Sequence, residues 1–501
     1  MKNETSKVRI RQLSTGVPGF DTVLGGGLPE YSFNVIAGAP GSGKTTLSQQ
    51  ILFANATPEA PAIFFTVLGE PSLKVLRYQQ QYDFFDSAKV GGAIRFVNLS
   101  MEVMDQDLDA VLERIVREVE SVTPGIVVVD SFRNIIRKAS STERSEVEMQ
   151  NFVQRLALFL TSWEATTFLV GEYMLDEMRN NALFTVADGL FWLTQNVERN
   201  AMERKLQIMK LRGQESMSGL HTFRISSQGI RIFPRNTGFA TKQARPFPIQ
   251  RISTGIPALD EMMGGGIPSG DSVLITGAAG SGKSTICTQF IAEGARHDEA
   301  GVIVVFEEHP QEYIARAMEI GFDMEAMMKA NKLRVIYLRP LDLSVDETLF
   351  AVSEAVNEIG ASRVVIDSLS GFEIALAPGA RSDFRESVYR MVLALTGVGV
   401  TVVNTVEMSA ILNDVRLSTH EISFLTDDII LQRYVEMDGK LERITAVVKT
   451  RHGNHSKELR RYEVTEKGIV IGDALYDYNN ILTGFPEKKV TEVPLNSDSI
   501  G

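Results

Sequence analysis

The chain has 501 residues, more than one hydrophobic core normally serves, so we expect two or three domains. Apolar residues make up 44% of the sequence and charged residues 23%, which is typical of globular proteins and excludes a disordered or fibrous chain. The formal net charge is −12 and no basic strip interrupts it, which argues against a nucleic-acid partner. No apolar run reaches the ~20 residues of a membrane-spanning helix, and the N-terminus has no apolar signal-peptide core. With its single cysteine, Cys287, the chain is therefore predicted to be cytoplasmic, without membrane contact.

A long internal repeat organises the sequence. The segment STGVPGFDTVLGGGLPEYSFNVIAGAPGSGKTTL, which begins at Ser14, recurs from Ser253 as STGIPALDEMMGGGIPSGDSVLITGAAGSGKSTI. A spacing of 239 residues indicates duplicated domains, because the units of a solenoid are only ~20 to 50 residues long. The predicted parts are a first domain over residues 1–234, a linker over 235–250, a second domain over 251–475 and a flexible tail over 476–501.

Within each half, short β-branched apolar runs alternate with longer helical patterns. The runs are NVIAGA, PAIFFTV, GIVVVD and TTFLVGEY in the first half, and SVLITGA, GVIVVFEE, SRVVIDS and GVTVVNTV in the second. Continuous apolar runs of this kind suit a parallel sheet that is buried on both faces. We therefore predict an α/β fold in each half, with a central, mostly parallel sheet flanked by helices.

Each half also contains a glycine-rich loop of the form G-x-x-x-x-G-K-[ST], placed between a predicted strand and a predicted helix. In such a loop, successive backbone N–H groups and the helix N-terminus converge on the β- and γ-phosphates of a nucleotide, so each half is predicted to bind ATP with Mg²⁺. The lysine of each loop reaches the phosphates and the hydroxyl that follows it ligates the metal. The predicted ATP-binding residues are Gly38, Gly41, Ser42, Gly43, Lys44, Thr45 and Thr46 in the first loop, and Gly277, Gly280, Ser281, Gly282, Lys283, Ser284 and Thr285 in the second.

An aspartate ends one predicted strand in each half: Asp130 after GIVVV and Asp367 after SRVVI. A carboxylate at this edge of the sheet can hold water on the magnesium ion, together with Thr45 in the first half and Ser284 in the second. The competing interpretation is a helix cap. The recurrence of the aspartate in both halves favours the metal role.

A pair of glutamates distinguishes the second half. Glu307 and Glu308 follow the strand GVIVVF, where a carboxylate can take a proton from an attacking water or hydroxyl. The matching positions in the first half hold Leu68 and Gly69, neither of which is a base. Glu70 is one residue further on and could serve through a shifted loop. Because a base tolerates only small displacements, we favour slow turnover at the first site.

The duplicated unit, its STG lead-in, the glutamate pair and a Lys-x-Arg element near the end of each half together resemble the KaiC family of bacterial clock ATPases and autokinases. The resemblance extends from about Ser14 to about Pro486. It implies two RecA-like domains and a two-tiered ring of six chains, a homohexamer with ATP and Mg²⁺ between neighbouring subunits. It also suggests a KaiB-like protein or a sensor kinase as a partner.

The Lys-x-Arg elements are Lys210 with Arg212 in the first half and Lys449 with Arg451 in the second. By resemblance to the family, these side chains reach across the subunit interface to a neighbour's γ-phosphate, as arginine fingers do. The alternative interpretation is a set of solvated charges on the edge of a strand.

The family also transfers phosphate to a neighbouring Ser-Thr pair, and here the chain departs from the pattern. Ser423 resembles the family serine, but Phe424 occupies the threonine position and has no hydroxyl, so a two-site phosphorylation cycle is in doubt. Ser418, Thr419 and Thr426 are further candidate acceptors. All these hydroxyls could instead cap a helix or pair across a subunit contact.

Three functions are consistent with the sequence. The favoured one is an ATP-hydrolysing autokinase, in which Glu308 or Glu307 is the base, Lys283 and Arg451 stabilise the phosphoryl group, and Ser423 of a neighbour is the acceptor. The second is a ring scaffold for a signalling partner, held together by ATP. The third is a DNA motor with the same fold, against which the net charge counts.

Overall fold

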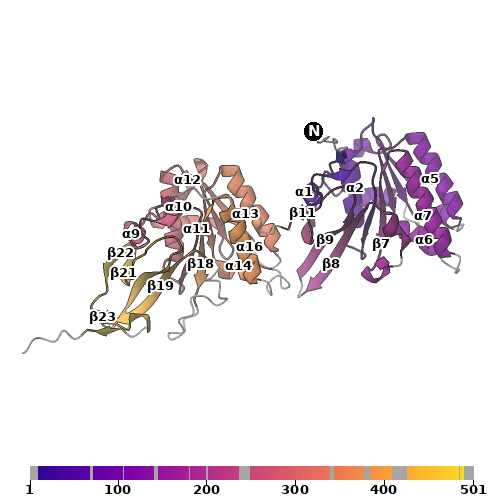
Figure 1. Ribbon diagram of the computed structural model, residues 1–501. Helices are drawn as coiled ribbons and strands as arrows, with labels where there is room; N and C mark the ends of the chain where they lie inside the picture. Colours follow the sequence, from indigo (N-terminus) through magenta and orange to yellow (C-terminus); the bar gives the residue numbers. More distant parts are fainter. Residues whose placement is uncertain are drawn as a thin grey trace, which may run out of the picture. The chain divides into compact units, whose positions relative to one another are not determined.

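A computed structural model of the chain describes residues 10–67, 72–104, 107–139, 145–179, 181–198, 201–235, 249–338, 343–376, 384–408, 426–483 and 486–489. The chain divides into two compact units, Met1–Arg235 and Asn236–Gly501 (Figure 1). Within the described ranges, no helix is both long enough and apolar enough to cross a membrane.

The first unit is built on a nine-stranded sheet. Its order is β11-β10-β9-β8-β3-β7-β6-β4-β5; the strands from β8 to β5 are parallel, whereas β9, β10 and β11 are antiparallel. The strands are β3 (Phe33–Gly38), β4 (Ala62–Thr66), β5 (Ile94–Asn98), β6 (Ile126–Asp130), β7 (Thr166–Glu172), β8 (Gly189–Glu198), β9 (Ala201–Leu211), β10 (Leu220–Ser226) and β11 (Gly229–Phe233).

Helices cover both faces of this sheet, as Figure 1 shows. One buried cluster packs beneath α5, α6 and α7, and a second packs beneath α1 and α2. Successive residues of β6 alternate between the two clusters, which is why its apolar run is continuous. The helices are α1 (Phe20–Leu24), α2 (Lys44–Asn55), α3 (Ser72–Gln79), α4 (Ser100–Met104), α5 (Leu108–Val122), α6 (Phe132–Ala139), α7 (Ser145–Ser162) and α8 (Ala182–Val186), with 3₁₀ turns η1 (Ser87–Lys89) and η2 (Leu175–Arg179).

The second unit repeats this plan, with the strand order β16-β15-β17-β18-β14-β19-β20-β21-β22. Each strand occupies the place of its counterpart in the first sheet, and the last three are again antiparallel. The strands are β14 (Ser272–Gly277), β15 (Gly301–Val305), β16 (Leu333–Tyr337), β17 (Arg363–Asp367), β18 (Thr401–Glu407), β19 (Asp428–Met437), β20 (Lys440–Lys449), β21 (Arg460–Thr465) and β22 (Gly468–Ala474).

Its helices also form two layers, with α13, α14 and α16 over one buried cluster and α9, α10, α11 and α12 over the other (Figure 1). The helices are α9 (Pro257–Met262), α10 (Lys283–Arg296), α11 (Pro310–Glu319), α12 (Met324–Lys329), α13 (Val345–Ile359), α14 (Leu369–Ala375) and α16 (Phe384–Gly397). The described residues also form three two-stranded ribbons: β1 (Gln12–Leu13) with β2 (Leu28–Pro29), β12 (Arg251–Ile252) with β13 (Ile267–Pro268), and β23 (Tyr478–Asn479) with β24 (Glu487–Lys488). The last ribbon encloses the turn η4 (Ile481–Thr483). The predicted tandem α/β fold is confirmed.

The recurrent STG lead-in has a structural explanation. Asp21 accepts hydrogen bonds from the Ser14 hydroxyl at 2.6 Å and from the Thr15 backbone N–H at 2.8 Å. Asp260 accepts the same two bonds, at 2.6 and 2.8 Å, from Ser253 and Thr254. The motif therefore ties the entry loop of each unit to its first helix, since a charged acceptor strengthens both bonds.

Candidate ATP-binding and catalytic sites

The two glycine-rich loops leave the carboxyl ends of the central strands. Gly41 and Gly43 have φ angles of 74° and 97°, and Gly280 and Gly282 have nearly the same values, 75° and 98°. Side chains are strained in this left-handed region, so glycine is required at these four positions. Gly43 and Gly282 are also the N-caps of α2 and α10, which leaves the first backbone N–H groups of both helices directed at the loop.

The lysine of each loop folds back over the loop backbone. Lys44 Nζ donates to the carbonyl of Ala39 at 2.7 Å, and Lys283 Nζ donates to the carbonyls of Gly277 and Ala278 at 2.9 and 2.8 Å. Burial lowers the pKa of both ammonium groups, and nearby carboxylates oppose this shift. Phosphate oxygens in the loop would raise these pKa values again, because an opposite charge favours the ionised form.

Thr45 and Asp130 converge as a magnesium site requires. The Thr45 hydroxyl donates to Asp130 Oδ2 at 2.6 Å, which places a hydroxyl and a carboxylate at one point beside the loop. Burial raises the pKa of Asp130 to about 6, while the Thr45 hydrogen bond and the Lys44 charge act in the opposite direction. A hard cation would favour the ionised carboxylate, and hydroxyl, carboxylate, water and phosphate are the oxygen ligands that Mg²⁺ prefers.

The second unit holds its aspartate differently. Asp367 accepts a hydrogen bond from Thr405 Oγ1 at 2.5 Å, a residue of the neighbouring strand β18. Ser284 is at the first turn of α10, as Thr45 is in α2. Among the described residues, no group of three or more His, Cys, Asp or Glu side chains could hold a metal by itself, so magnesium at either site would depend on the nucleotide phosphates and water.

The two glutamates after β15 have different surroundings. Glu307 Oε1 accepts a hydrogen bond from Ser368 Oγ at 3.2 Å, next to Asp367. Glu308 forms a bidentate ion pair with Arg316 of α11, with both N–O distances 2.7 Å. The Glu307 carboxylate is therefore directed toward the end of β17, whereas Glu308 is held by α11.

Gly371 makes room for Glu307. A Cβ atom at Gly371 would lie 2.8 Å from both Cγ and Oε1 of Glu307, closer than real Cβ contacts allow. The Gly371 backbone N–H also donates to Ser368 Oγ at 3.0 Å, so the same hydroxyl links α14 to the glutamate. Neither Ser368 nor Arg316 was predicted from the sequence as part of the site.

The Lys-x-Arg elements lie at the end of each sheet opposite to the glycine-rich loop. Lys210 Nζ donates to the carbonyl of Thr185 at 2.9 Å, and Arg212 Nη1 pairs with Asp188 at 3.2 Å, at the start of β8. In the register of the sheet Lys210 is level with Val35 of β3, three residues or about 10 Å at ~3.3 Å per residue before Gly38, and Arg212 lies farther from the loop. Both side chains are bound at the end of the sheet remote from the loop of their own unit. In the second unit, Lys449 Nζ donates to the Thr426 carbonyl at 2.5 Å.

Arg451 is largely exposed beside a buried acidic cluster. Its Nη1 pairs with Asp427 at 3.0 Å, and 65% of its side chain is exposed. Behind it, His452 Nδ1 lies 2.9 Å from Asp271 Oδ2. Burial, and then the nearby Asp271 carboxylate, raise the pKa of Asp428 to about 7.

Two acidic residues near the loops were also missed. The carboxylates of Glu172 and Glu407, which end β7 and β18, both oppose the lowering of the lysine pKa in their unit. The recurrence of a glutamate after TTFLVG and after TVVNTV was the available signal.

Several predicted residues lie outside the described ranges: Leu68, Gly69, Glu70, Ser418, Thr419, Ser423 and Phe424.

Thr426, the remaining candidate acceptor, is described and is only 2% exposed. A hydroxyl so deeply buried cannot meet a phosphoryl group unless the segment moves. This burial argues against Thr426 as an acceptor.

Two nine-stranded α/β units, each with a glycine-rich loop at the carboxyl end of its central strand and an aspartate two strands away, define a tandem P-loop ATPase. A family model described as "ATPase: KaiC" matches residues 13–237 and again residues 252–476. The chain belongs to the KaiC ATPase family.

Curated relatives match almost the whole chain. The circadian clock oscillator protein KaiC of Rippkaea orientalis is 29% identical over 502 residues, which cover 97% of this chain and 94% of the relative. The proteins of the same name from Prochlorococcus marinus and Thermostichus vulcanus are 29% and 30% identical, covering 97% and 93% of their own lengths. The chain is thus similar to these proteins over nearly its whole length.

Proposed function

We propose that this protein is an ATPase and serine/threonine autokinase that transfers the γ-phosphoryl group of ATP, in its second domain, to water or to Ser423 of a neighbouring subunit. The hydrogen bond between Ser368 and Glu307 is the observation that carries the proposal. It supports a carboxylate base beside Asp367, at the edge of the sheet where the second loop lies. The first loop would bind Mg-ATP without a glutamate pair in the matching positions.

In this proposal each group has one task. Lys283 and the N–H groups of the loop neutralise the phosphate charge, Ser284 and Asp367 hold Mg²⁺, and the base accepts the proton of the attacking hydroxyl. The O–H of the acceptor loses its proton to the glutamate, the Oγ–P bond forms, and ADP leaves with the electrons of the broken P–O bond. With water as the acceptor, the products are ADP and inorganic phosphate.

Glu307 and Glu308 are both candidate bases, and their contacts favour Glu307. The charge of Glu307 contributes to the pKa of Lys283, which supports its nearness to the phosphate site. Glu308 would first have to leave both nitrogens of Arg316. A base must lie within ~3 Å of the proton it takes, so freeing Glu308 would require a rotation of its side chain.

The remote position of the Lys-x-Arg elements supports a ring. A cation that is bound at the end of its sheet remote from the nucleotide of its own unit can still serve a neighbour's nucleotide, which is the arrangement of an arginine finger supplied in trans. We propose a cytoplasmic homohexamer in which Lys210, Arg212, Lys449 and Arg451 approach the ATP of the adjacent subunit. A clock or signalling partner, such as a KaiB-like protein or a sensor kinase, is part of the same proposal, because the relatives are named as clock oscillator proteins.

A second candidate function is an ATP-dependent scaffold with little kinase activity. The specific observation in its favour is chemical: Leu68 and Gly69 replace the glutamate pair in the first half, and Phe424 replaces an acceptor hydroxyl. ATP would then serve mainly to hold neighbouring subunits together.

Incubation with γ-labelled ATP, followed by peptide mapping, tests the proposal. We expect label on the peptide that contains Ser423 in the wild-type protein, and loss of that label in Glu307→Gln and in Ser423→Ala. Glu308→Gln distinguishes the two candidate bases: label that survives in Glu308→Gln but not in Glu307→Gln assigns the base to Glu307, and the reverse result assigns it to Glu308. An unlabelled peptide in a protein that still hydrolyses ATP would exclude the autokinase and leave the ATPase and the scaffold.

A further inference from the structure

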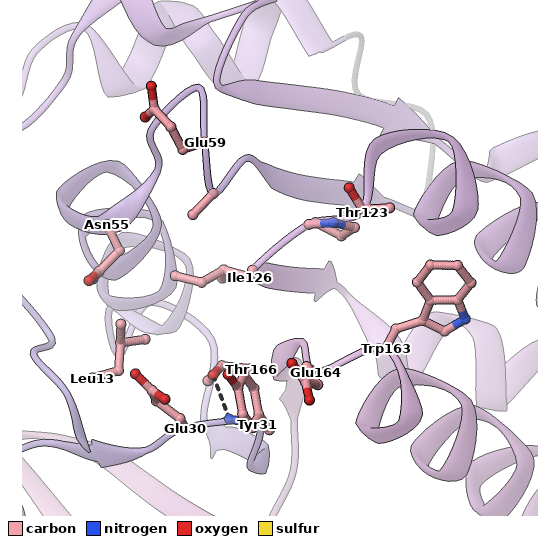
Figure 2. A pocket seen from close by; sticks show the side chains of 13 residues that line it. Leu13, Glu30, Tyr31, Asn55, Glu59, Thr123, Ile126, Trp163, Glu164 and Thr166 are labelled. Atoms are coloured by element: carbon pink, nitrogen blue, oxygen red, sulfur yellow. Dashed lines mark hydrogen bonds between the residues drawn. The ribbon is translucent and has the colours of Figure 1, made fainter. Parts of the chain in front are cut away.

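The first domain contains a pocket of about 340 Å³ at the end of its sheet opposite to the ATP loop. This volume is at the lower end of the ~300–1,000 Å³ of typical ligand pockets. Figure 2 shows its walls, which come from the starts of β6 and β7, the end of α2 and the turn after α7. The lining residues include Glu30, Tyr31, Asn55, Glu59, Trp163 and Glu164.

The pocket has acidic and aromatic walls and no basic residue in its lining. Glu30, Glu59 and Glu164 contribute three carboxylates, and none of them has an ion-pair partner within the part of the chain that the structure describes. Tyr31 is 39% exposed and Trp163 is 38% exposed, so ring surface remains accessible. Carboxylates beside accessible aromatic rings favour a cation, and most of all a planar guanidinium.

The second domain has an arginine in the matching place. In the first sheet Ala62 pairs with Ile126, and in the second Gly301 pairs with Arg363, so Arg363 is the counterpart of Ile126. A second contact confirms the equivalence. The Tyr31 backbone N–H donates to Thr166 Oγ1 at 3.0 Å. The Gly270 backbone N–H donates to Thr401 Oγ1 at 2.8 Å.

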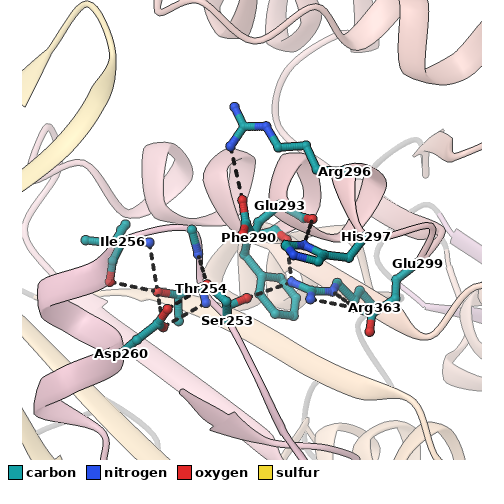
Figure 3. Close-up of polar contacts among 11 residues, drawn as sticks. Ser253, Thr254, Ile256, Asp260, Phe290, Glu293, Arg296, His297, Glu299 and Arg363 are labelled. Atoms are coloured by element: carbon teal, nitrogen blue, oxygen red, sulfur yellow. Dashed lines mark hydrogen bonds and ion pairs between the residues drawn. The ribbon is translucent and has the colours of Figure 1, made fainter. Parts of the chain in front are cut away.

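Arg363 is 1% exposed and has polar partners at all three of its nitrogen atoms (Figure 3). Its Nε and Nη2 contact Glu299 Oε2 at 2.7 and 2.6 Å. Its Nη1 donates to the carbonyls of Ser253 and Phe290 at 2.9 and 2.7 Å. The guanidinium carbon also lies 4.6 Å from the centre of the Phe290 ring. Charge, hydrogen bonds and aromatic contact thus hold this guanidinium at the end of the second sheet.

The first domain lacks that arginine but keeps part of its bonding. Asn55 donates to the carbonyls of Ser14 and Ile51, both at 2.9 Å, and these are the counterparts of the two carbonyls that Arg363 binds. Gly294 occupies the place of Asn55 in the second domain. A Cβ atom there would lie 2.6 Å from Arg363 Cδ and Nε. The Asn55 amide of the first domain and the Arg363 side chain of the second are therefore alternative donors to the same two carbonyls. The Asn55 amide fills much less of the space at this end of the sheet than Arg363 does.

We propose that the pocket of the first domain receives the guanidinium group of an arginine side chain from a partner polypeptide. In the second domain the chain supplies this group itself, through Arg363, and Glu299 neutralises it. In the first domain Ala60 stands where Glu299 would be, and Glu59 and Glu164, which line the same pocket as Trp163, provide the negative charge. Bidentate contact with a carboxylate and stacking on an aromatic ring are the features that distinguish arginine from lysine at such sites.

The test uses the fluorescence of Trp163, because the chain has two tryptophans and the other, Trp192, is only 4% exposed. The full-length protein is titrated with N-acetyl-arginine N-methylamide and, as a neutral isosteric control, with the matching citrulline compound. We expect a saturable change with the arginine compound and none with citrulline. The double variant Glu59→Gln with Glu164→Gln is expected to weaken binding at least about tenfold, and Trp163→Phe to remove the signal.

A triple variant provides a more direct test, because it builds the arginine of the second domain into the first: Asn55→Gly, Ala60→Glu and Ile126→Arg together. It should abolish binding, because its own guanidinium would occupy the pocket. Equal binding of citrulline, or unchanged binding by either the built-in variant or the glutamine variant, would overturn the proposal. Tighter binding of free arginine than of the doubly capped compound would overturn the polypeptide source. The surface glutamine variant keeps the test valid if the triple variant does not fold.

Discussion

The buried arginine of the second domain gives a stability prediction that the internal repeat makes testable. Arg363→Ile copies the first domain at this position, and it removes the guanidinium donors from the Ser253 and Phe290 carbonyls and from Glu299. Breaking a buried charge pair costs ~3–5 kcal/mol, and each buried acceptor left without a donor costs ~1–3 kcal/mol. Because Glu299 is 31% exposed and regains water, we expect a total of about 3–5 kcal/mol.

The first domain also predicts a second substitution that restores part of the stability lost in Arg363→Ile. Gly294→Asn alone should destabilise the second domain by ~1–3 kcal/mol, because its Cβ would lie 2.6 Å from Arg363. Combined with Arg363→Ile, the same substitution supplies an amide that donates to the Ser253 and Phe290 carbonyls, as Asn55 does for their counterparts. The double variant should then be more stable than the sum of the single effects by ~0.5–3 kcal/mol.

Scanning calorimetry on the four proteins measures this cycle. For a domain of this size, ~1 kcal/mol shifts the midpoint by ~2–4 °C, so Arg363→Ile should lower the second-domain transition by roughly 6–20 °C. Ile126→Val is the matched control in the first domain, with an expected cost of ~0.5–1.5 kcal/mol. A loss below about 1 kcal/mol for Arg363→Ile, or strictly additive effects in the double variant, would refute the reasoning.

Three further predictions concern the sites. Because the pKa of Asp130 is raised to about 6, protons compete with Mg²⁺ for this carboxylate below that pH. In Lys283→Ala, the affinity for Mg-ATP measured by calorimetry should therefore fall from pH 7 to pH 5. Adding Asp130→Asn should remove this dependence of the affinity on pH. The pKa of Asp428 is raised to about 7, so its contribution to the free energy of unfolding falls as pH rises from about 4 through 7. Asp428→Asn should therefore raise the melting temperature of the second domain more at pH 8 than at pH 5. An equal gain at both pH values would contradict this prediction. Arg316→Gln should lower the stability of the second domain by less than ~1 kcal/mol, because the Arg316–Glu308 ion pair is partly exposed. The same variant should change the rate of ATP turnover, because it frees Glu308. Unchanged turnover would show that Glu308 takes no part in the reaction.

The ATP loops could be predicted from the sequence with little ambiguity. Their chemistry is local, because each loop has two glycines in the left-handed region, a lysine and a hydroxyl within eight residues. The continuous apolar strands also predicted the buried sheets, because adjacent residues of a strand such as β6 face the two different cores. Asp21 and Asp260 belonged to a repeated motif whose bonding only the structure explains.

The remaining features depend on contacts between distant segments. Arg363 lies in the run SRVVIDS, which predicts a strand but gives no sign that its arginine is buried against Glu299, 64 residues earlier in the chain. Arg316 is a residue of a helix whose pairing with Glu308 depends on the turn between β15 and α11. The trans role of the Lys-x-Arg elements followed from the family resemblance, and the position of Lys210 far from Gly38 supports it without testing it.

The division of labour between the two loops is the central claim, and steady-state ATP turnover by Lys44→Ala and Lys283→Ala tests it most directly. We predict that Lys283→Ala removes most turnover and all label from the peptide containing Ser423. Lys44→Ala should retain label transfer in the chains that remain assembled, as determined by light scattering. Equal loss of turnover in both variants, with assembly intact, would contradict a catalytic second domain joined to an assembling first one.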